Sequence, residues 1–496
     1  MKGKISGNAL TVPLIAVCLL FGLSVVDWKA VSGGALSNFN LIEDIVETTH
    51  IASEDTPDAT DDLIDPALEA AIAEVTSEAE LPVHDFIADN NQEILPVPVS
   101  DATRIDEPDA IEKPVDIEEP IVAKKVAQPS QRVNGILPIE DYTFDQSGLR
   151  HLKSALTRRD SRRVRIAVIG DSYIEGDIFA QDIRRLLQQE YGGRGVGYMS
   201  MHSDFPGFRQ SVNQSDQGWT VRDMRNHSSD KVKPLSGEYC IGNIGSVTTF
   251  KGSKMDYAHD WSSSKLLFIA ENDGSITVKT DSLTQEFPIK AGEQVQMINI
   301  DDETSKAVFR LNSNGVKVLG AWLEDNRGVG VDCMSLRGNS GATHKSISMQ
   351  LAEQMRQHVP YDLIIIEYGL NVLSHQQSKY DSYGKLMSQV VSHLKKCYPD
   401  CDIMMLGVGD RGRKNGSSVS SVSTIESLIS AQRNCAAECG ILFWDTRSAM
   451  GGEDAIVDWR ERRLVNADYI HLNHKGGKEL ANEFVNSLKF MINGSN

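Results

Sequence analysis

The chain has 496 residues, of which 40% are hydrophobic and 24% are charged, so most of it can bury a core and a wholly disordered protein is excluded. Its formal net charge is −19. Residues 41–130 contain 24 Asp and Glu against four Lys and Arg, a net of −20, so the other 406 residues carry a net of +1. Because phosphate binding needs clustered basic residues, this distribution argues against a nucleic-acid partner.

The first 35 residues are predicted to form a membrane anchor or a signal segment. Lys2 and Lys4 precede an uncharged run over residues 8–26, which is about long enough to cross a bilayer. Basic residues before such a run predict that the rest of the chain is exported. We therefore expect contact with the cytoplasmic membrane through this segment and a periplasmic location for the remainder. The small residues at positions 30–32 favour the alternative, a cleaved signal and a soluble exported protein.

Residues 36–132 are predicted to be an acidic, disordered linker. They contain nine of the 16 prolines and almost no aromatic residues. Such a composition buries too little apolar surface to offset the entropy lost on ordering. Together with the preceding segment, this stretch is expected to act as a tether.

The remainder begins with a helix predicted over 142–156 and then repeats a strand–helix pattern. The first unit is the apolar strand 163–170 followed by an amphipathic helix over 177–191. Further strands are predicted over 361–368, 402–408 and 441–445, and further helices over 346–358, 383–398, 424–437 and 475–492. Repeated units of this kind predict an α/β fold, in which a doubly wound parallel sheet forms the middle of three layers. We assign residues 133–204 and 336–496 to this domain.

Residues 205–335 differ in character, with short alternating apolar runs separated by turn signals such as Asn272-Asp-Gly274. This pattern predicts an inserted antiparallel β-sandwich. Its aromatic residues include Trp219, Trp261 and Tyr257, whose rings would be able to stack on sugars, and Trp322, which is expected in the core.

A candidate nucleophile lies at the end of the first strand. Ser172 follows Gly170 and Asp171 at the turn that leads into the first helix. In an open parallel sheet the carboxyl ends of the strands form the ligand crevice, and a nearby helix N-terminus favours an anion. The other reading of this triplet is an ordinary turn with a capping serine.

The partners that a serine nucleophile needs are found further along the chain. Asp468 and His471 are three residues apart, so the carboxylate can orient the imidazole while the other ring nitrogen faces the serine. Asn371 follows the second core strand and Gly341 lies in a turn before a helix, and both have groups that could donate to an oxyanion. Each of these signals alone is also typical of a structural histidine or a turn residue.

The order Gly-Asp-Ser, Gly, Gly-x-Asn, Asp-x-x-His resembles the four sequence blocks of the SGNH (GDSL-type) hydrolases. The resemblance implies that Ser172 is the nucleophile, His471 the general base and Asp468 its orienting partner. It also implies an oxyanion hole made by the Ser172 amide, the Gly341 amide and the Asn371 side chain. No metal or organic cofactor is expected.

The run from residue 164 to Ser172 and the glycine-rich segment 191–198, followed by a β-rich insertion, is similar to exported peptidoglycan O-acetylesterases of this family. That similarity implies an esterase that removes acetyl groups from an acetylated polysaccharide or peptidoglycan through an acetyl-serine intermediate, with a carbohydrate-binding insertion. A glycan O-acetyltransferase with the same triad, a lipase or thioesterase, and a non-catalytic envelope-binding protein remain alternatives. The six cysteines outside the membrane segment are compatible with disulfides or with simple packing.

Overall fold

The computed structural model describes residues 129–416 and 418–494 of the chain. The predicted membrane segment and nearly all of the predicted acidic linker lie outside the described residues. Within the described part of the chain, no helix combines the length and the apolar character that crossing a membrane would require.

A six-stranded sheet forms the centre of the fold, with the strand order β1-β17-β14-β13-β2-β12. Five of its strands are parallel, and the edge strand β1 is antiparallel to β17. Numbered along the chain, the parallel strands lie in the order 2-1-3-4-5, which is a doubly wound topology. The predicted α/β fold is confirmed. The strands are β1 (Glu140–Asp141), β2 (Arg163–Gly170), β12 (Gly328–Ser335), β13 (Leu363–Glu367), β14 (Asp402–Leu406) and β17 (Leu442–Trp444).

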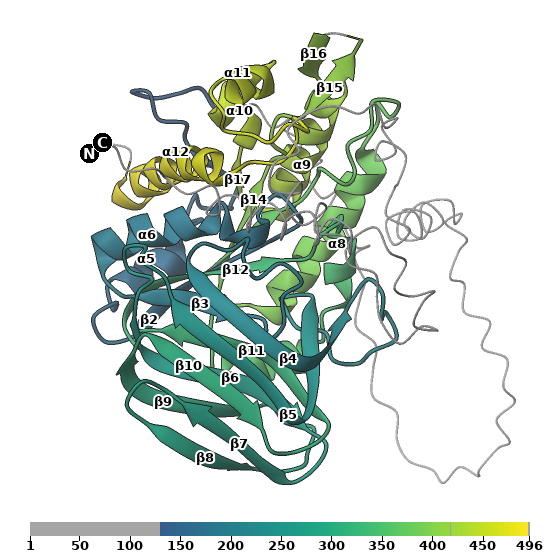
Figure 1. Ribbon diagram of the computed structural model, residues 1–496. Coiled ribbons are helices and arrows are strands. Elements are labelled where there is room, and N and C mark those ends of the chain that lie inside the picture. Colours follow the sequence, from purple (N-terminus) through teal and green to yellow (C-terminus); the bar gives the residue numbers. More distant parts are fainter. Residues whose placement is uncertain (1–128, 417, 495–496) are drawn as a thin grey trace, which may run out of the picture. The chain divides into compact units, whose positions relative to one another are not determined.

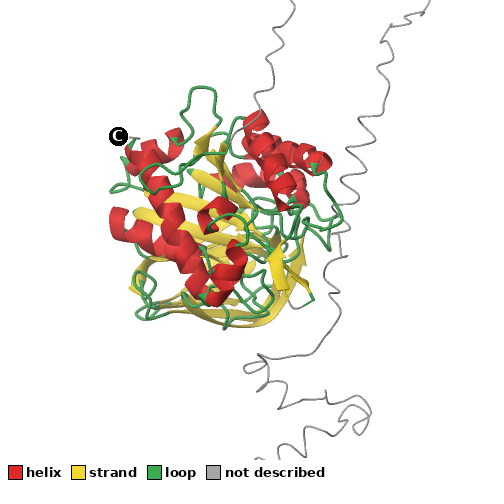
Figure 2. Ribbon diagram, turned by 90° about the horizontal axis from the view of Figure 1, so that it is seen from above, coloured by secondary structure: helices red, strands yellow, loops and turns green. Residues whose placement is uncertain are grey.

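Helices cover both faces of this sheet (Figures 1 and 2). α6 and α12 pack against each other on one side, and α8 and α9 pack against each other on the other side. All eight residues of β2 are buried as a result, which explains its nearly continuous apolar sequence. The α-helices are α5 (Arg150–Leu156), α6 (Ala180–Tyr191), α7 (Met349–Arg356), α8 (Asp381–Cys397), α9 (Ile425–Cys439), α10 (Thr446–Met450), α11 (Ala455–Glu461) and α12 (His474–Asn493).

The helix predicted over 142–156 is wrong in its first half, because α5 begins only at Arg150. The carboxylate of Asp141 accepts hydrogen bonds from the amides of Thr143 and Gly148, at 2.9 and 3.1 Å. A side chain that bonds nearby amides in this way offers the backbone an alternative to a helix. The segment therefore forms turns between β1 and α5.

The inserted region forms a second, antiparallel sheet of nine strands, in the order β8-β7-β10-β5-β11-β6-β9, with β3 paired to β11 and β4 paired to β5. It encloses a separate hydrophobic core that includes Phe250, Trp261 and Phe309. The antiparallel character is as predicted, but the strands form one connected network and the two-sheet sandwich is not confirmed. The strands are β3 (Gly195–Met199), β4 (Val212–Asp223), β5 (Glu238–Gly252), β6 (Trp261–Ala270), β7 (Gly274–Lys279), β8 (Thr284–Ile289), β9 (Gln296–Thr304), β10 (Lys306–Leu311) and β11 (Val316–Glu324).

The two sheets exchange strands at the predicted limits of the insertion. β3, placed in the α/β domain by the sequence, pairs with β11, whereas β12, placed in the insertion, pairs in parallel with β2. The sequence of β12 hides its nature because glycines and Asp332 interrupt it. The buried Asp332 carboxylate accepts hydrogen bonds from Trp322 Nε1, the Tyr361 hydroxyl and the Tyr198 amide, at 2.7 to 2.9 Å. These donors satisfy a buried carboxyl group that would otherwise be costly inside the fold.

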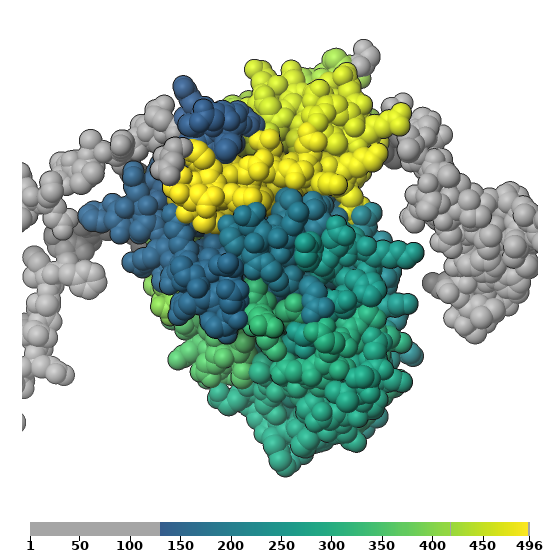
Figure 3. All heavy atoms as spheres, turned by 90° about the vertical axis from the view of Figure 1, so that its left-hand side faces the viewer, coloured from purple at the N-terminus to yellow at the C-terminus, as the bar shows by residue number. Residues whose placement is uncertain are grey.

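A buried group of charges also joins the two sheets. The side chain of Glu324 in β11 is fully buried and forms an ion pair with Arg165 of β2. It lies 2.9 Å from Lys265 Nζ in β6 and 3.3 Å from Arg163 Nε in β2. On one face of the molecule, the first βα unit lies between the C-terminal helices and the inserted strands (Figure 3). The inserted sheet is therefore fixed directly to the strand that carries the candidate nucleophile.

The six cysteines outside the predicted membrane segment are free thiols. Four of them, Cys240, Cys333, Cys397 and Cys435, are buried. Of the two readings that the sequence left open, the structure supports packing.

Candidate active site

The turn that carries Ser172 lies where the doubly wound sheet reverses direction. β2 ends at Gly170, which pairs with Glu367 at the end of β13. β12 lies on the other side of β2, so the two chain connections diverge at this point, where open α/β sheets bind their ligands. Ser172 is partly exposed, and its neighbours Asp171 and Tyr173 are buried.

Three side chains predicted from distant parts of the sequence form a hydrogen-bonded chain at this turn. Ser172 Oγ lies 2.9 Å from His471 Nε2, and His471 Nδ1 lies 2.8 Å from Asp468 Oδ2. With Nδ1 protonated toward the carboxylate, Nε2 is free to accept the serine proton. The arrangement has the geometry of a nucleophile, a general base and an orienting carboxylate.

The backbone around His471 is held by close packing against the segment after Ser172. Gly476 and Gly477 lie in the first turn of α12, after the capping residue Asn473, whose side chain accepts from the amides of Lys475 and Gly476. A Cβ atom at Gly477 would collide with the carbonyl oxygen of Ile178, so only glycine allows α12 to approach this closely. The loop before α12 is thereby fixed beside Ser172.

Asp468 is held in its charged form. Its Oδ1 accepts from the amides of Ile470 and His471, at 2.9 and 3.1 Å, while Oδ2 faces the imidazole. Partial burial raises the pKa of Asp468, but the hydrogen bonds from the His471 ring and from these amides outweigh it and lower the pKa below its ordinary value. The carboxylate is therefore available to stabilise a protonated imidazole.

The other two predicted oxyanion donors lie near the triad but are engaged within the protein. The Asn371 side-chain amide donates to Asp171 Oδ2 at 2.8 Å and to the Asn339 carbonyl at 3.1 Å. The Gly341 amide donates to Asn339 Oδ1 at 3.0 Å. The structure thus brings Asn371 to the serine turn, and the oxyanion role of Ser172, Gly341 and Asn371 stays a prediction.

Comparison with known proteins agrees with this geometry. A model of the GDSL-like lipase/acylhydrolase family matches residues 281–478. A solved structure of a peptidoglycan O-acetylesterase is similar with a TM-score of 0.58 at 19% identity, covering 72% of this chain and 99% of that one. The family match supports an SGNH/GDSL-type hydrolase, and the similar structure supports the same fold.

Other solved structures resemble the hydrolase more weakly. A family two carbohydrate esterase from Cellvibrio japonicus gives a TM-score of 0.26 at 11% identity, over 57% of this chain and 98% of that one. The protein YXIM_BACsu from Bacillus subtilis gives 0.28 at 13% identity, over 60% and 97%. The search against curated proteins found no significant match.

The family match includes Asn371, Asp468 and His471 but begins after Ser172. Along the sequence, the inserted strands separate Ser172 from the other blocks. In the fold, the chain returns to the side of β2 through β12, so the later blocks can lie near Ser172.

Two buried carboxyl groups, those of Asp171 and Glu367, lie at the serine turn. The sequence analysis assigned no role to either of them. Asp171 accepts from the Tyr173 amide at 2.8 Å and from Asn371, so it links the nucleophile turn to the predicted oxyanion residue. Burial raises the pKa of Asp171 to about 6 against the lowering effect of these hydrogen bonds. Glu367 is 1% exposed, and in the described part of the chain its carboxyl oxygens have no hydrogen-bond partner. A single acidic residue ending an otherwise apolar strand was the signal that would have identified it.

Glu367→Gln is expected to stabilise the hydrolase at alkaline pH. Burial, followed by the charge of Asp171, raises the pKa of Glu367 well above its ordinary value. A carboxyl whose pKa is raised by folding contributes stability that is complete below its unfolded pKa and is lost as the pH rises through the folded pKa. Glu367→Gln introduces an uncharged amide and so removes this loss. The loss amounts to about 1.4 kcal/mol for each unit by which the folded pKa exceeds the unfolded pKa.

The measurement is the free energy of unfolding of Glu367→Gln and wild type at pH 5 and pH 8. The increase in the free energy of unfolding that Glu367→Gln causes should be larger at pH 8 than at pH 5. Glu353→Gln, on the exposed face of α7, is the matched control and should show no such trend. An equal effect of Glu367→Gln at both pH values would show that Glu367 does not titrate as inferred.

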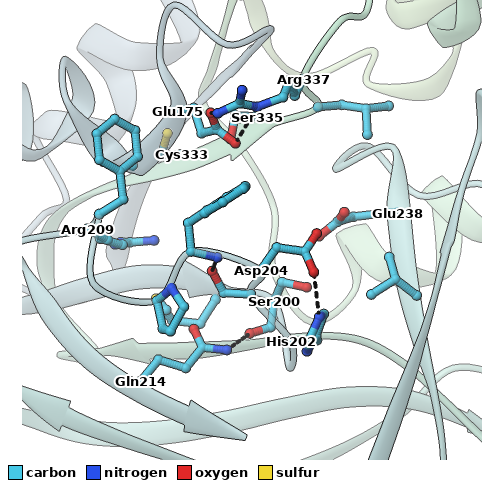
Figure 4. Close-up of a pocket in the computed structure, with 18 of the residues that line it drawn as sticks. Glu175, Ser200, His202, Asp204, Arg209, Gln214, Glu238, Cys333, Ser335 and Arg337 are labelled. Atoms are coloured by element: carbon cyan, nitrogen blue, oxygen red, sulfur yellow. Dashed lines mark hydrogen bonds and ion pairs between the residues drawn. The ribbon is translucent and has the colours of Figure 1, made fainter. Parts of the chain in front are cut away.

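A pocket of about 330 Å³ opens beside the serine turn, between the hydrolase core and the inserted strands. Glu175, three residues after Ser172, lines it together with Ser335 and Arg337 from the end of β12. Figure 4 shows the facing pair Glu175 and Arg337 on one side of this pocket and His202 with Glu238 on the other. Its walls combine polar and charged side chains with apolar ones such as Phe205 and Phe208.

Proposed function

We propose that this protein is an exported serine esterase that removes O-acetyl groups from a glycan of the cell envelope, with peptidoglycan as the first candidate. The observation that carries the proposal is the hydrogen-bonded chain Ser172–His471–Asp468 at the carboxyl end of the sheet. An intact chain of this kind favours an enzyme over a non-catalytic binding protein on the same fold.

In this proposal Ser172 Oγ attacks the acetyl carbonyl carbon while His471 Nε2 takes the hydroxyl proton. The tetrahedral intermediate collapses as His471 returns that proton to the departing sugar oxygen, which leaves an acetyl-serine and a free sugar hydroxyl. Water then attacks the acetyl-serine with His471 again as general base, and acetate is released. Asp468 stabilises the imidazolium in both steps.

The choice of a glycan over a long acyl chain is supported by the pocket that begins at Glu175, three residues after Ser172. A lipase or thioesterase would need an apolar crevice there, whereas charged residues such as Glu175, Asp204 and Arg337 line this one. A similar fold occurs in a peptidoglycan O-acetylesterase, which supports an acetylated envelope glycan as the substrate. Export and anchoring through residues 1–35 are part of the same proposal, because the substrate lies outside the cytoplasm.

The proposal is tested on the full-length protein with a fluorophosphonate probe and with acetylated polymers. The probe should modify Ser172, identified by peptide mass spectrometry, and acetate should be released from O-acetylated peptidoglycan. Acetylated xylan serves as the comparison polymer. Modification of a different residue, or no acetate release from either polymer, would contradict the proposed esterase.

A further inference from the structure

The pocket beside the serine turn has two aromatic rings on its rim. Phe205 and Phe208, on the loop from β3 to β4, are 58% and 37% exposed. The Phe208 ring lies over Gly176, where a Cβ atom would collide with it, and its ring centre is 5.9 Å from that of His474. This loop therefore contacts both the segment after Ser172 and the start of the helix that follows His471.

Planar polar groups lie beside these rings. The Arg337 guanidinium is 5.4 Å from the centre of the Phe205 ring and pairs with both carboxylate oxygens of Glu175. Arg225, in the turn between β4 and β5, reaches from the inserted sheet to the catalytic side and donates to the carbonyl oxygen of Arg337. The Phe205 ring and the paired planar groups of Arg337 and Glu175 therefore lie side by side at one edge of the pocket.

Arg225 is not fully satisfied within the described residues. Its guanidinium forms no ion pair there, and its Nε is buried without a hydrogen-bond partner. A Cβ atom at Gly338 would lie 2.6 Å from Arg225 Nη1, so the guanidinium rests on the backbone of the loop that contains Asn339. A buried donor without a partner loses the hydrogen bond that water would supply, and a ligand oxygen in the pocket would restore it.

We propose that this pocket binds one pyranose ring of the glycan chain, next to the sugar that presents its acetyl ester to Ser172. A pyranose has a C–H face that packs on an aromatic ring and a rim of hydroxyl groups, whose oxygens accept from Arg225 and Arg337 and whose O–H groups donate to Glu175. The pocket volume of about 330 Å³ lies at the lower end of the range for small-ligand sites. The inference rests on the proposed function, and it makes the inserted sheet part of the substrate site.

The test compares two substrates of the full-length protein, an O-acetylated chitotetraose and nitrophenyl acetate, which has no sugar. For Phe205→Ala and Arg225→Gln, the ratio of kcat/KM on the tetrasaccharide to kcat/KM on nitrophenyl acetate should fall at least about tenfold, mainly through KM. Phe144→Ala, which removes a fully exposed ring from the loop after β1, is the matched control and should leave the ratio unchanged. Because Phe205 is exposed, its replacement should not alter the melting temperature.

Calorimetry of Ser172→Ala separates this inference from the proposed function. Ser172→Ala should bind unacetylated chitotetraose or xylotetraose, and the added Phe205→Ala substitution should weaken that binding about tenfold. If wild type cleaves neither ester yet the tetrasaccharide binds and Phe205→Ala weakens it, the esterase fails and the sugar site stands. Equal losses on both substrates, or no binding of either tetrasaccharide, would overturn the sugar site.

Discussion

Ser172→Ala is expected to lower kcat on nitrophenyl acetate by about 10³-fold to 10⁶-fold. Ser172 Oγ is 2.9 Å from His471 Nε2, so its hydroxyl is the group that the base can activate. Removing the nucleophile of a triad leaves only the catalysis that comes from substrate binding and the oxyanion hole. Ser172 is partly exposed, so its loss should leave the melting temperature nearly unchanged.

The rate is measured by nitrophenolate release under saturating substrate, with the unfolding transition recorded for the same preparation. Ser427→Ala, at a half-buried position of α9 that does not line the pocket, removes a hydroxyl of the same kind and should retain wild-type turnover. Turnover by Ser172→Ala within about tenfold of wild type would exclude Ser172 as the nucleophile.

Glu324→Gln is expected to cost about 3–5 kcal/mol of the free energy of unfolding, because it leaves buried cations without their counter-charge. The side chain of Glu324 is fully buried, and those of Arg165 and Lys265 are 5% and 8% exposed. Burial raises the pKa of Glu324, but Arg165, Lys265 and Arg163 outweigh it and hold the pKa far below its ordinary value. The carboxylate therefore stays charged across the neutral range, and its contribution is lost only in strong acid.

Chemical denaturation at pH 7 measures this loss. Glu303→Gln provides the control, since Glu303 is 66% exposed where it pairs with Arg194 and a surface pair contributes at most about 1 kcal/mol. A loss below about 1 kcal/mol for Glu324→Gln would mean that water or rearrangement compensates the three cations, and that this contact does not fix the inserted sheet to β2.

An element could be predicted from the sequence where its own residues show the pattern that burial requires. The strand at 163–170 could be predicted because helices cover both of its faces and every position is apolar or packed. Strand β12 could not, because the glycines and Asp332 that interrupt it are tolerated only through partners supplied by Trp322 and Tyr361. Such tertiary compensation leaves no trace in the local pattern.

The residues of the candidate site divide in the same way, into those that the sequence indicates and those that depend on their neighbours in the fold. Ser172, Asp468 and His471 are predicted from their order and spacing, and the fold brings the three side chains together, while their catalytic roles stay a prediction. The parts inferred for Glu367 and Arg225 depend on what the fold places beside them, which is Asp171 for Glu367 and the loop after β12 for Arg225. No spacing rule indicates that a turn of the inserted sheet meets the loop after β12.

In the proposed mechanism the two halves of the catalytic pair are 299 residues apart, and the base lies on a loop next to α12, which packs against the segment after Ser172. During synthesis the nucleophile is therefore made long before the residue that activates it. A growing chain that has reached the end of β13 would already contain most of the parallel sheet, yet would be chemically silent toward esters. If Ser172 and His471 act as proposed, a product truncated before residue 471 lacks the general base, and esterase activity requires synthesis to continue past that residue.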